Sequence, residues 1–391
     1  MQKNKSLVLG ITGGIAAYKA AELVRLLIKS NISVRVVMTE AATKFITPMT
    51  LQALSGKPVY VGMWDSSIDN GMPHIELSRA VDAILIAPAS AEFVAKLLHG
   101  RADDLLSTLC LARDCPLLVA PAMNKQMWEN PATKRNFAQL KADNIAVLGP
   151  GNGEQACGET GDGRMLEAEQ LLAHVKAHFT PKILAGKKVL ITAGATLEMI
   201  DPVRGITNLS SGKMGYALAQ ASSNMGAEVT LVSGASHLSA PMNVNIQYAT
   251  SAKAMYAKVM ENIQSQDIFI GVAAVADYSP DEIANQKIKK SAESLTLNLT
   301  RNQDILADVA NLPNPPFCVG FAAESEGVTT YAAQKRIAKK LPLIVANEVT
   351  STIGNDDNQV TLIDDHGSYP LEKASKEIVA IQILAHMYNL L

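Results

Sequence analysis

The chain has 391 residues, and at roughly 150 residues per domain this length predicts two or three domains. Apolar residues make up 48% of it and charged residues 18%, which excludes an intrinsically disordered protein. The formal charge of −2 argues against a surface whose main role is to bind nucleic acid or an anionic membrane, but it is compatible with a local anion pocket.

The four cysteines, Cys110, Cys115, Cys157 and Cys318, form no Cys-x-x-Cys pair, and no histidines stand at zinc spacing. A disulfide framework or a structural zinc is therefore not expected, and the reducing cytoplasm is the predicted compartment. The apolar stretch 7–18 follows two lysines, as in a signal peptide. Glycines interrupt it and charged residues follow at once, so we expect a strand that leads into a helix. No apolar run approaches the roughly 18 residues of a membrane span.

Short strands and helices alternate along the first 180 residues. Five runs are rich in Val, Ile and Leu without polar alternation, which is typical of parallel strands buried on both faces. Apolar spacing predicts helices over 15–29 and 168–178. The predicted strands are 6–11, 33–38, 83–87, 116–120 and 145–148.

The same pattern restarts with a strand from Lys187, after a segment over 181–186 that we interpret as a linker. A long loop over 196–211 precedes the next predicted helix, at 213–225. We therefore predict an α/β protein with two tandem Rossmann-like domains, 1–180 and 187–391. The other predicted elements are strands at 228–232, 268–272, 317–321 and 343–346, helices at 305–311 and 330–340, a hairpin-like pair near 359–364 and a terminal helix from 371.

Polar or glycine-containing segments follow the predicted strands of the first domain, at the sheet edge where open α/β sheets bind ligands. The first, Gly10-Ile-Thr-Gly-Gly14, lacks the full Gly-x-Gly-x-x-Gly spacing, so it indicates a NAD site only weakly. Glu40 either holds a ribose or is a solvated loop acid. The stretch 149–165 is too long and too polar for a core segment, and such loops are usually functional or disordered.

Four motifs in this half resemble the flavin-dependent cysteine decarboxylases. They are GITGGIAAYKA, PASA, PAMNKQMW and ACGETGDGRM. The third and fourth are highly specific together, and the match covers essentially the whole first half. The resemblance implies a flavodoxin-like domain that binds FMN, with the flavin site between the subunits of a trimer.

The chemistry explains why such an enzyme needs a flavin. Loss of CO2 from a cysteinyl carboxylate leaves a carbanion, and no protein side chain is an electron sink for it. A flavin can first accept a hydride from the CH2–SH group, which gives a thioaldehyde that takes up those electrons. The hydride must later be returned, and an acid must supply a proton.

The resemblance assigns roles to individual residues. Cys157 is the proton donor, His74 is the base near the thiol-bearing carbon, and Asn124 holds the substrate carboxylate. The alternatives are an inert core cysteine and a structural histidine. The flavin contacts that the resemblance implies are Gly13, Thr39, Ser90, Ser107 and Met123.

In the second half, Ser210-Ser-Gly-Lys-Met-Gly215 opens a predicted helix and invites comparison with a P-loop. A P-loop has four residues between its glycines, whereas six separate Gly205 from Gly212, and Met214 replaces the Ser or Thr that binds magnesium. A nest of N–H groups with one lysine remains, which suits a phosphate. A helix start without a ligand is the alternative.

Six motifs of this half resemble the phosphopantothenate–cysteine ligases in their CTP-using bacterial form. They are ITAGAT, IDPVR, ITNLSSGKMG, GVAAVADY, KIKK and GFAAES. Decarboxylase followed by ligase is the order in the bifunctional enzymes of coenzyme A biosynthesis, and this resemblance covers nearly the whole chain. It implies ligation of cysteine to 4'-phosphopantothenate and then decarboxylation to 4'-phosphopantetheine.

A carboxylate resists attack by an amine, so the ligase must first convert it to a mixed anhydride with CMP. Charge then develops on the triphosphate, which calls for Mg2+ and lysines. By resemblance, Lys287 faces the α-phosphate, Asn208 contacts the acyl-cytidylate and Arg204 assists its attack by cysteine; Asp277 is also the implied metal residue. The alternative for the lysine-rich runs 287–290 and 335–340 is that they are solvated helix faces. The implied nucleotide-binding residues are Gly271, Val272, Ala273, Asp277, Lys287, Asn302, Gln303, Asp304, Ile305, Phe321, Lys335 and Lys339.

The implied partners are small molecules, namely 4'-phosphopantothenate, cysteine and CTP, and neither nucleic acid nor a membrane. A homo-oligomer is also implied, built from trimers of the first domain, up to a dodecamer, with dimers of the second. Two alternative functions remain. One is a flavin prenyltransferase-like enzyme, against which the Cys157 loop and the second domain argue; the other is a flavoprotein that acts as a non-catalytic regulatory subunit.

Overall fold

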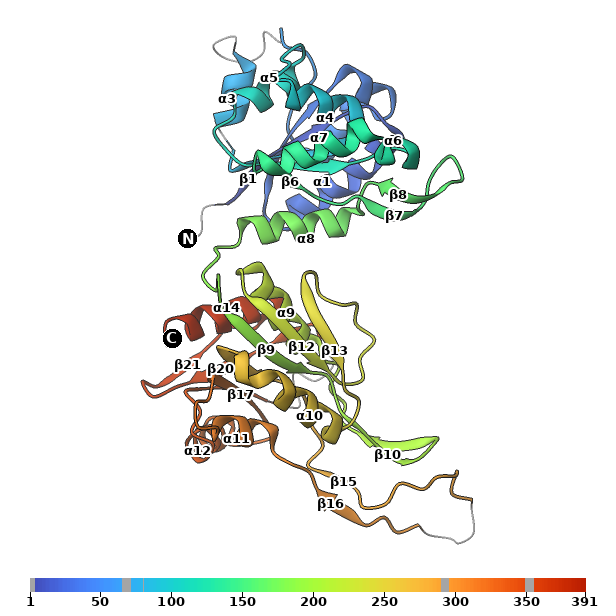
Figure 1. Cartoon of the computed structure of the whole chain (residues 1–391). Helices are drawn as coiled ribbons and strands as arrows, with labels where there is room; N and C mark the ends of the chain where they lie inside the picture. Colours follow the sequence, from blue (N-terminus) through green and yellow to red (C-terminus); the bar gives the residue numbers. More distant parts are fainter. Residues whose placement is uncertain (1–3, 65–71, 80, 290–294, 349–354) are drawn as a thin grey trace. The chain divides into compact units, whose positions relative to one another are not determined.

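The structure is a computed structural model that describes residues 4–64, 72–79, 81–289, 295–348 and 355–391. The chain divides into two compact units, Met1–Phe179 and Thr180–Leu391. Each unit has its own sheet with helices on both faces (Figure 1). No helix in these described ranges is long and apolar enough to cross a membrane.

The first unit contains a six-stranded parallel sheet in the order β3-β2-β1-β4-β5-β6. All residues of its central β4 are buried, which explains the uninterrupted apolar run in the sequence. The sequence carries no signal for β3, because this strand has only two residues. The strands are β1 (Ser6–Ile11), β2 (Ser33–Met38), β3 (Val59–Tyr60), β4 (Ala83–Ala89), β5 (Leu117–Pro121) and β6 (Ala146–Val147).

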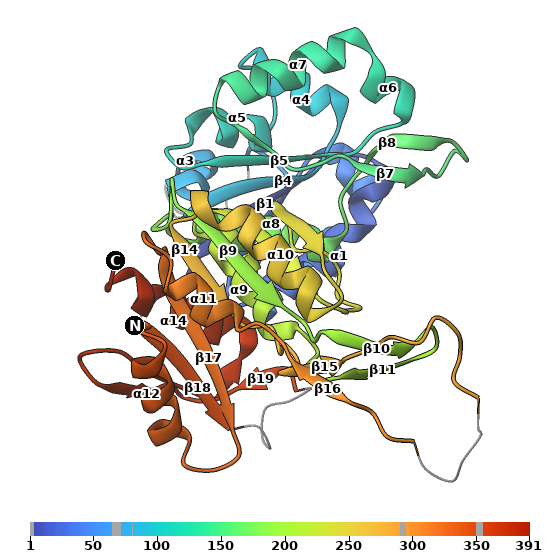
Figure 2. The same ribbon diagram turned by 60° about the horizontal axis from the view of Figure 1, so that its bottom comes forward.

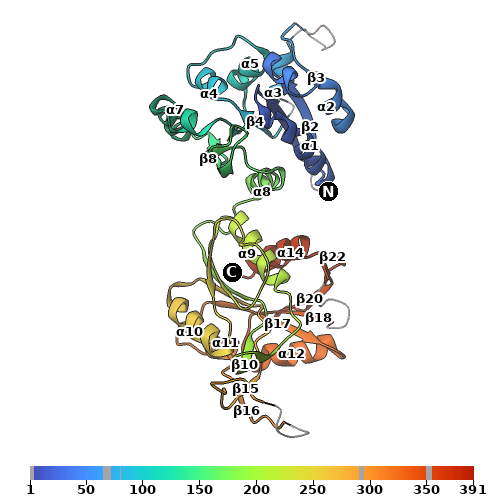
Figure 3. The ribbon, with the colours of Figure 1, turned by 90° about the vertical axis from the view of Figure 1, so that its right-hand side faces the viewer.

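Helices cover both faces of this sheet, as Figure 3 shows. One face packs against α1 (Lys19–Lys29), α2 (Pro48–Ser55) and α8 (Ala168–Phe179). The helix predicted from residue 15 is divided, because a 3-10 helix over Ile15–Tyr18 precedes α1. The other face packs against α3 (Pro73–Arg79), α4 (Ala91–Leu98), α5 (Leu105–Ala112) and α7 (Pro131–Ala142); α6 (Lys125–Glu129) precedes α7.

The second unit contains an eight-stranded sheet in the order β13-β12-β9-β14-β17-β18-β20-β21, in which β20 pairs antiparallel with both β18 and β21. Within the predicted linker 181–186, Leu184 is fully buried in the core of this unit. The strands are β9 (Lys188–Ala193), β12 (Glu228–Ser233), β13 (Val244–Tyr248), β14 (Ile268–Gly271), β17 (Phe317–Glu324), β18 (Leu343–Glu348), β20 (Val360–Ile363) and β21 (Ser368–Pro370).

Two helix layers complete the second unit. Its α9 (Lys213–Asn224) and α14 (Lys376–Tyr388) pack on one face of the sheet. The opposite face carries α10 (Ala252–Asn262), α11 (Ile305–Ala310) and α12 (Val328–Ala338) (Figure 1). Both units are therefore doubly wound α/β domains, which confirms the predicted fold class.

Two segments predicted as loops are antiparallel ribbons instead. Residues 149–165 form β7 (Gly151–Glu154) and β8 (Thr160–Arg164), and residues 196–211 form β10 (Leu197–Asp201) and β11 (Arg204–Thr207). Their glycine and polar content hides the strand pattern, since neither ribbon belongs to a buried sheet. A third ribbon pairs β15 (Tyr278–Pro280) with β16 (Leu299–Arg301), and Figure 2 shows it beside β10 and β11.

Candidate active sites

The ligand edge of the first sheet centres on Thr12, directly after β1. Its hydroxyl donates to the Pro88 carbonyl (2.8 Å) and accepts from the Ser90 N–H (2.9 Å), so it joins the ends of β1 and β4. Strand order reverses between these two strands, and open α/β sheets bind ligands at that point. Sequence reasoning missed Thr12, although it lies within the GITGG motif.

Three of the predicted flavin contacts lie on loops that follow β1, β2 and β4. Thr39 caps a 3-10 helix by accepting from Ala42 N–H (3.3 Å), and Ser90 caps α4 by accepting from Phe93 N–H (3.2 Å). Gly13 has no room for a side chain, because a Cβ there would lie 2.6 Å from the Ala41 Cβ. The structure therefore gathers Gly13, Thr39 and Ser90 at one sheet edge.

Asn124 lies on the loop between β5 and α6, and this loop contacts the β7–β8 ribbon. Its Oδ1 accepts from the Met127 N–H (3.2 Å) and so caps α6. The preceding Met123 donates its N–H to the Gly163 carbonyl (2.9 Å) in β8, and a Cβ on Gly163 would lie 2.5 Å from the Met123 carbonyl oxygen. The β7–β8 ribbon is thereby fixed against the β5–α6 loop.

Cys157 lies at the tip of this ribbon and is exposed. Its Sγ is 3.7 Å from the Asn124 Nδ2, so the structure brings together two residues that are far apart in sequence. The thiol also lies within 3.4 Å of a Glu159 carboxylate oxygen, and that oxygen accepts a hydrogen bond from the Asn124 amide. Sequence reasoning missed Glu159, because a carboxylate in a polar loop carries no signal of its own.

His74 lies on α3 and is partly buried. Its Nδ1 is buried and has no hydrogen-bond partner among the described residues. A buried nitrogen without a partner is costly, so it indicates a missing ligand or water. No hydrogen bond joins His74 to Cys157 or Asn124 within the described part of the chain, so the structure does not bring the predicted base and acid into contact.

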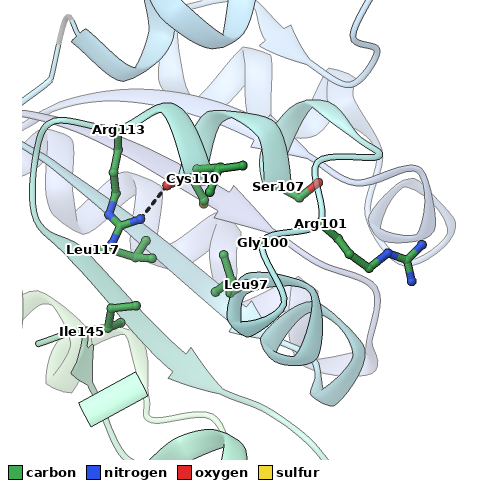
Figure 4. A pocket seen from close by; sticks show the side chains of 9 residues that line it. Leu97, Gly100, Arg101, Ser107, Cys110, Arg113, Leu117 and Ile145 are labelled. Atoms are coloured by element: carbon green, nitrogen blue, oxygen red, sulfur yellow. Dashed lines mark hydrogen bonds between the residues drawn. The ribbon is translucent and has the colours of Figure 1, made fainter. Parts of the chain in front are cut away.

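Ser107 is the predicted flavin contact with the least accessible hydroxyl. The side chain is buried, and its hydroxyl forms a capping box with Asp104 at the start of α5. Figure 4 shows Ser107 on the wall of a small hollow next to Arg101. The hollow also contains Cys110, whose thiol pKa burial raises to about 12, but it does not include Cys157 or Asn124.

The second sheet uses a threonine in the same place as the first. Thr192, near the end of β9, accepts through its hydroxyl from the N–H groups of Val272 (3.2 Å) and Ala273 (3.3 Å), which follow β14. Strand order reverses between β9 and β14, so Gly271, Val272 and Ala273 lie at the switch point. The backbone N–H groups of two predicted nucleotide-binding residues are therefore already engaged with Thr192.

The loop after β14 is held by two asparagines that the sequence had singled out. Asn208 donates its amide to the Ala274 carbonyl (3.0 Å), and Asn302 donates its amide to the Ala276 carbonyl (2.8 Å). The Asn302 N–H also donates to the carbonyl of Asp277 (2.8 Å), whose side chain is exposed. Asn208, Asn302 and Asp277 thus lie around one loop.

Arg204 forms an ion pair that its predicted role did not include. Its guanidinium donates to the Asp201 carboxylate through Nε (2.9 Å) and Nη2 (2.5 Å), and to the Ile288 carbonyl (3.0 Å). The Ile288 N–H donates to the same carboxylate (3.1 Å). Arg204 holds the pKa of the Asp201 carboxyl well below its usual range, and three backbone N–H donors act in the same direction against burial.

The Asp201–Arg204 pair fixes the segment that carries Lys287. Because Ile288 is bonded through both its N–H and its carbonyl, the backbone next to the exposed Lys287 is held in place. Lys290, the last lysine of the run, lies outside the described residues. Sequence reasoning missed Asp201, although the IDPVR motif contains it.

The remaining predicted nucleotide contacts lie at the start of α11, on β17 and at the C-terminal end of α12. Asp304 caps α11 and pairs with Lys339 (2.5 Å). Burial raises the pKa of the Asp304 carboxyl, but Lys339, the helix N–H and Lys335 together bring it below its ordinary value. The side chain of Ile305 is buried in the core, Phe321 is partly buried, and Gln303 is exposed.

The helix start that resembles a P-loop lies against the end of β9. α9 begins after Gly212 without a side-chain cap, but Lys213 extends to Asp356 (2.6 Å). No group of three His, Cys, Asp or Glu side chains that could hold a metal ion occurs within the ranges that the structure describes. Asp277 therefore lies outside any protein-only metal cluster of those ranges, and a Mg2+ there would need phosphate oxygens as further ligands.

Comparisons with known proteins cover both units. Residues 1–180 match the family model described as Flavoprotein, and residues 184–390 match the DNA/pantothenate metabolism flavoprotein C-terminal domain. The Coenzyme A biosynthesis bifunctional protein CoaBC of Vibrio parahaemolyticus serotype O3:K6 (strain RIMD 2210633) is 50% identical over 99% of this chain and 98% of its own. Its namesake from Escherichia coli (strain K12) is 46% identical over 97% and 96%.

One solved structure similar to this chain is the C-terminal domain of a Coenzyme A biosynthesis bifunctional protein CoaBC. It shares 39% sequence identity with this chain, at a TM-score of 0.47, and the match covers 54% of this chain and 97% of that one.

Proposed function

This chain belongs to the family of bifunctional coenzyme A biosynthesis proteins, and from that premise we propose how its two units divide the reaction sequence. The chain is a bifunctional enzyme that synthesises phosphopantothenoylcysteine and decarboxylates it. Its first unit is a flavoprotein domain. In our proposal this unit carries the decarboxylase and the second unit carries a ligase that uses CTP.

The flavin that suits the first unit is FMN. Loops after β1, β2 and β4 meet at one sheet edge, and the 3-10 helix that follows Gly14 has no side-chain cap, so its first N–H groups can bind a phosphate. The buried Nδ1 of His74, which has no hydrogen-bond partner among the described residues, also fits a bound ligand. When bound, FMN supplies the reversible hydride acceptance that a cysteinyl decarboxylation needs.

The chain's own residues bind the substrate and transfer its protons. Asn124 holds the substrate carboxylate with a neutral amide, which leaves that group free of a countercharge that would hinder CO2 loss. Cys157, 3.7 Å from the Asn124 Nδ2, donates the proton that completes the product. His74 accepts the proton of the substrate thiol, and Thr39, Ser90, Ser107 and Met123 line the flavin.

The second unit activates the phosphopantothenate carboxylate. Lys287 faces the α-phosphate of CTP from the segment that Asp201 and Arg204 brace. Asn208 holds the acyl-cytidylate, and Arg204 stabilises charge while cysteine attacks. Asp277 would hold Mg2+ together with the triphosphate, and the ion would offset the charge of the phosphates. The rest of the nucleotide contacts two loops and α12, through residues 271–273 and 302–305 with Phe321, Lys335 and Lys339.

We also propose a homo-oligomer that covers the ligand edge of the first unit. Large apolar side chains are exposed there on the 3-10 helices and α2, namely Ile15, Tyr18, Phe45 and Met49. Exposed apolar groups of this size mark interaction surfaces. A trimer formed through the first unit would cover these side chains, and dimers of the second unit would extend the assembly. The substrates of the chain are the small molecules of the pathway.

The observation that supports the division most directly is the contact between Cys157 and Asn124. The test is to incubate the full chain with 4'-phosphopantothenate, cysteine, CTP and Mg2+ and to identify products by mass spectrometry. We expect 4'-phosphopantetheine with CMP and pyrophosphate. In a parallel reaction with ATP in place of CTP, formation of AMP at the same rate would contradict the CTP assignment. A product that keeps its carboxyl group would contradict the decarboxylase assignment.

A further inference from the structure

Glu159 lies between the two residues proposed to act on the substrate carboxyl group. One oxygen of its carboxylate accepts a hydrogen bond from the Asn124 Nδ2 and lies 3.4 Å from the Cys157 Sγ. Asn124 and Cys157 therefore already form a site that binds a carboxylate, and a side chain of the chain itself fills it.

The ribbon tip holds Glu159 in this position by several contacts. The Gln155 N–H donates to the Glu159 carbonyl (2.8 Å), which closes the turn that carries Cys157. The Gln155 side chain accepts from the Lys125 N–H (2.9 Å) and donates to the Asp162 carbonyl (3.1 Å). The contact of Glu159 with Asn124 is therefore anchored from both the ribbon and the start of α6.

We propose that Glu159 is a positioning residue that stands in for the substrate carboxylate and must be displaced when the substrate binds. This inference rests on the proposed role of Asn124. Two carboxylates this close repel each other, so Glu159 and the substrate carboxylate cannot both lie against the Asn124 amide. The side chain of Glu159 is partly exposed, so it can turn into solvent when it leaves Asn124.

The need to displace Glu159 should lower the affinity for the substrate but not for the decarboxylated product. A ligand with a carboxylate competes with Glu159, whereas the decarboxylated product does not need the Asn124 amide. Glu159 therefore weakens binding of the substrate relative to the product-like form, and it reoccupies Asn124 once CO2 has left. Because the ground-state carboxylate is bound less tightly, the enzyme–substrate complex is stabilised less and the barrier to CO2 loss is not raised.

The test uses two ligands that differ only in the carboxylate. One is the amide of 4'-phosphopantothenate with serine, whose hydroxyl replaces the reacting thiol; the other is the matching amide with 2-aminoethanol. Dissociation constants are measured by calorimetry on the flavin-loaded full chain. We expect Glu159→Gln and Glu159→Ala to bind the serine amide roughly three- to tenfold more tightly, with the aminoethanol amide unchanged, because a charge-assisted competitor has been removed.

Two controls separate this inference from the proposed function. Glu154→Gln makes the same chemical change on β7, where the side chain is exposed, and should leave both constants unchanged. Asn124→Ser keeps a capping oxygen for α6 but removes the amide, so it should weaken binding of the serine amide and leave the aminoethanol amide unchanged. If it does not, the role of Asn124 and this inference both fail.

A different result would overturn the inference alone. If Asn124→Ser weakens binding of the serine amide as expected but Glu159→Gln weakens it as well, then Glu159 supports the substrate instead of competing with it. Equal tightening of both ligands would show a general change in the ribbon and would also contradict displacement. In steady-state kinetics, the KM for phosphopantothenoylcysteine in decarboxylation should fall three- to tenfold in Glu159→Gln, while the KM for cysteine in the ligase reaction stays the same.

Discussion

The two sheets use the same device at the same topological position. In the first unit the hydroxyl of Thr12 joins the end of β1 to the loop after β4, and in the second the hydroxyl of Thr192 joins β9 to the loop after β14. Both threonines are buried. A doubly wound sheet separates its loops at the point where strand order reverses, so a side chain that bridges the gap gives the ligand edge a fixed shape.

The units differ in the segments that come after that threonine. In the first unit a 3-10 helix begins at Ile15 almost at once, and the proposed proton donor Cys157 lies on the β7–β8 ribbon late in the unit. In the second unit the β10–β11 ribbon is inserted before α9 and braces the Lys287 segment through Asp201. In our proposal, one edge design serves two chemistries because ribbons outside the sheet carry Cys157 in the first unit and brace the Lys287 segment in the second.

The largest expected effect is on the decarboxylation assigned to the first unit, with the ligation assigned to the second unit unchanged. Cys157→Ser should slow decarboxylation by roughly 10²–10⁴-fold, because a hydroxyl is a much weaker acid than a thiol, and should leave ligation unchanged. Product analysis measures both rates in one reaction. Cys115→Ser, which alters another partly exposed thiol of the same unit, is the control and should behave as wild type. Decarboxylation by Cys157→Ser at the parent rate would rule out the acid role.

The reciprocal variant removes a charge in the second unit. Lys287→Gln should reduce acyl-cytidylate formation by about 10²-fold, since one charge that stabilises the transition state is lost, without changing decarboxylation of supplied phosphopantothenoylcysteine. Pyrophosphate release measures the first step. Lys289→Gln, two residues further on and also exposed, should cost far less. An equal loss in both variants would show that the run acts only through its net charge.

The shared threonines allow a matched pair of substitutions. Thr12→Val leaves the Ser90 N–H without its partner, and Thr192→Val does the same to Val272 and Ala273. Each should cost about 1–3 kcal/mol of unfolding free energy in its own unit, as expected for buried N–H groups that lose their acceptor. Denaturant unfolding combined with the two activities measures this. Loss of both activities in either variant would contradict independent edges.

A smaller effect is expected from two buried thiols, one in each unit. Burial raises the pKa of Cys110 and of Cys318 to about 12, whereas unfolded thiols ionise near 8.5. The unfolded state therefore loses these protons first, so stability falls as pH rises above about 8.5, by about 1–2 kcal/mol per thiol at pH 10. Cys110→Ala and Cys318→Ala should each flatten the alkaline decline, measured by urea unfolding. A decline of unchanged slope would contradict the assignment.

The sequence predicted the sheets better than the ribbons. Apolar runs such as that of β4 identify buried parallel strands, because burial on both faces leaves a continuous signal. The ribbons have no such signal, and the contact of Cys157 with Asn124 depends on where β7 and β8 fold back. The partners of Arg204 could not be predicted either, since its bond to the Ile288 carbonyl spans 84 positions.

In our proposal the first unit decarboxylates with a bound flavin and the second unit ligates without one. The most direct measurement compares both rates, in the full chain, across preparations that hold different amounts of FMN as read from visible absorption. We expect a decarboxylation rate proportional to bound FMN and a constant ligation rate. Colourless protein that still releases CO2 from phosphopantothenoylcysteine would contradict it.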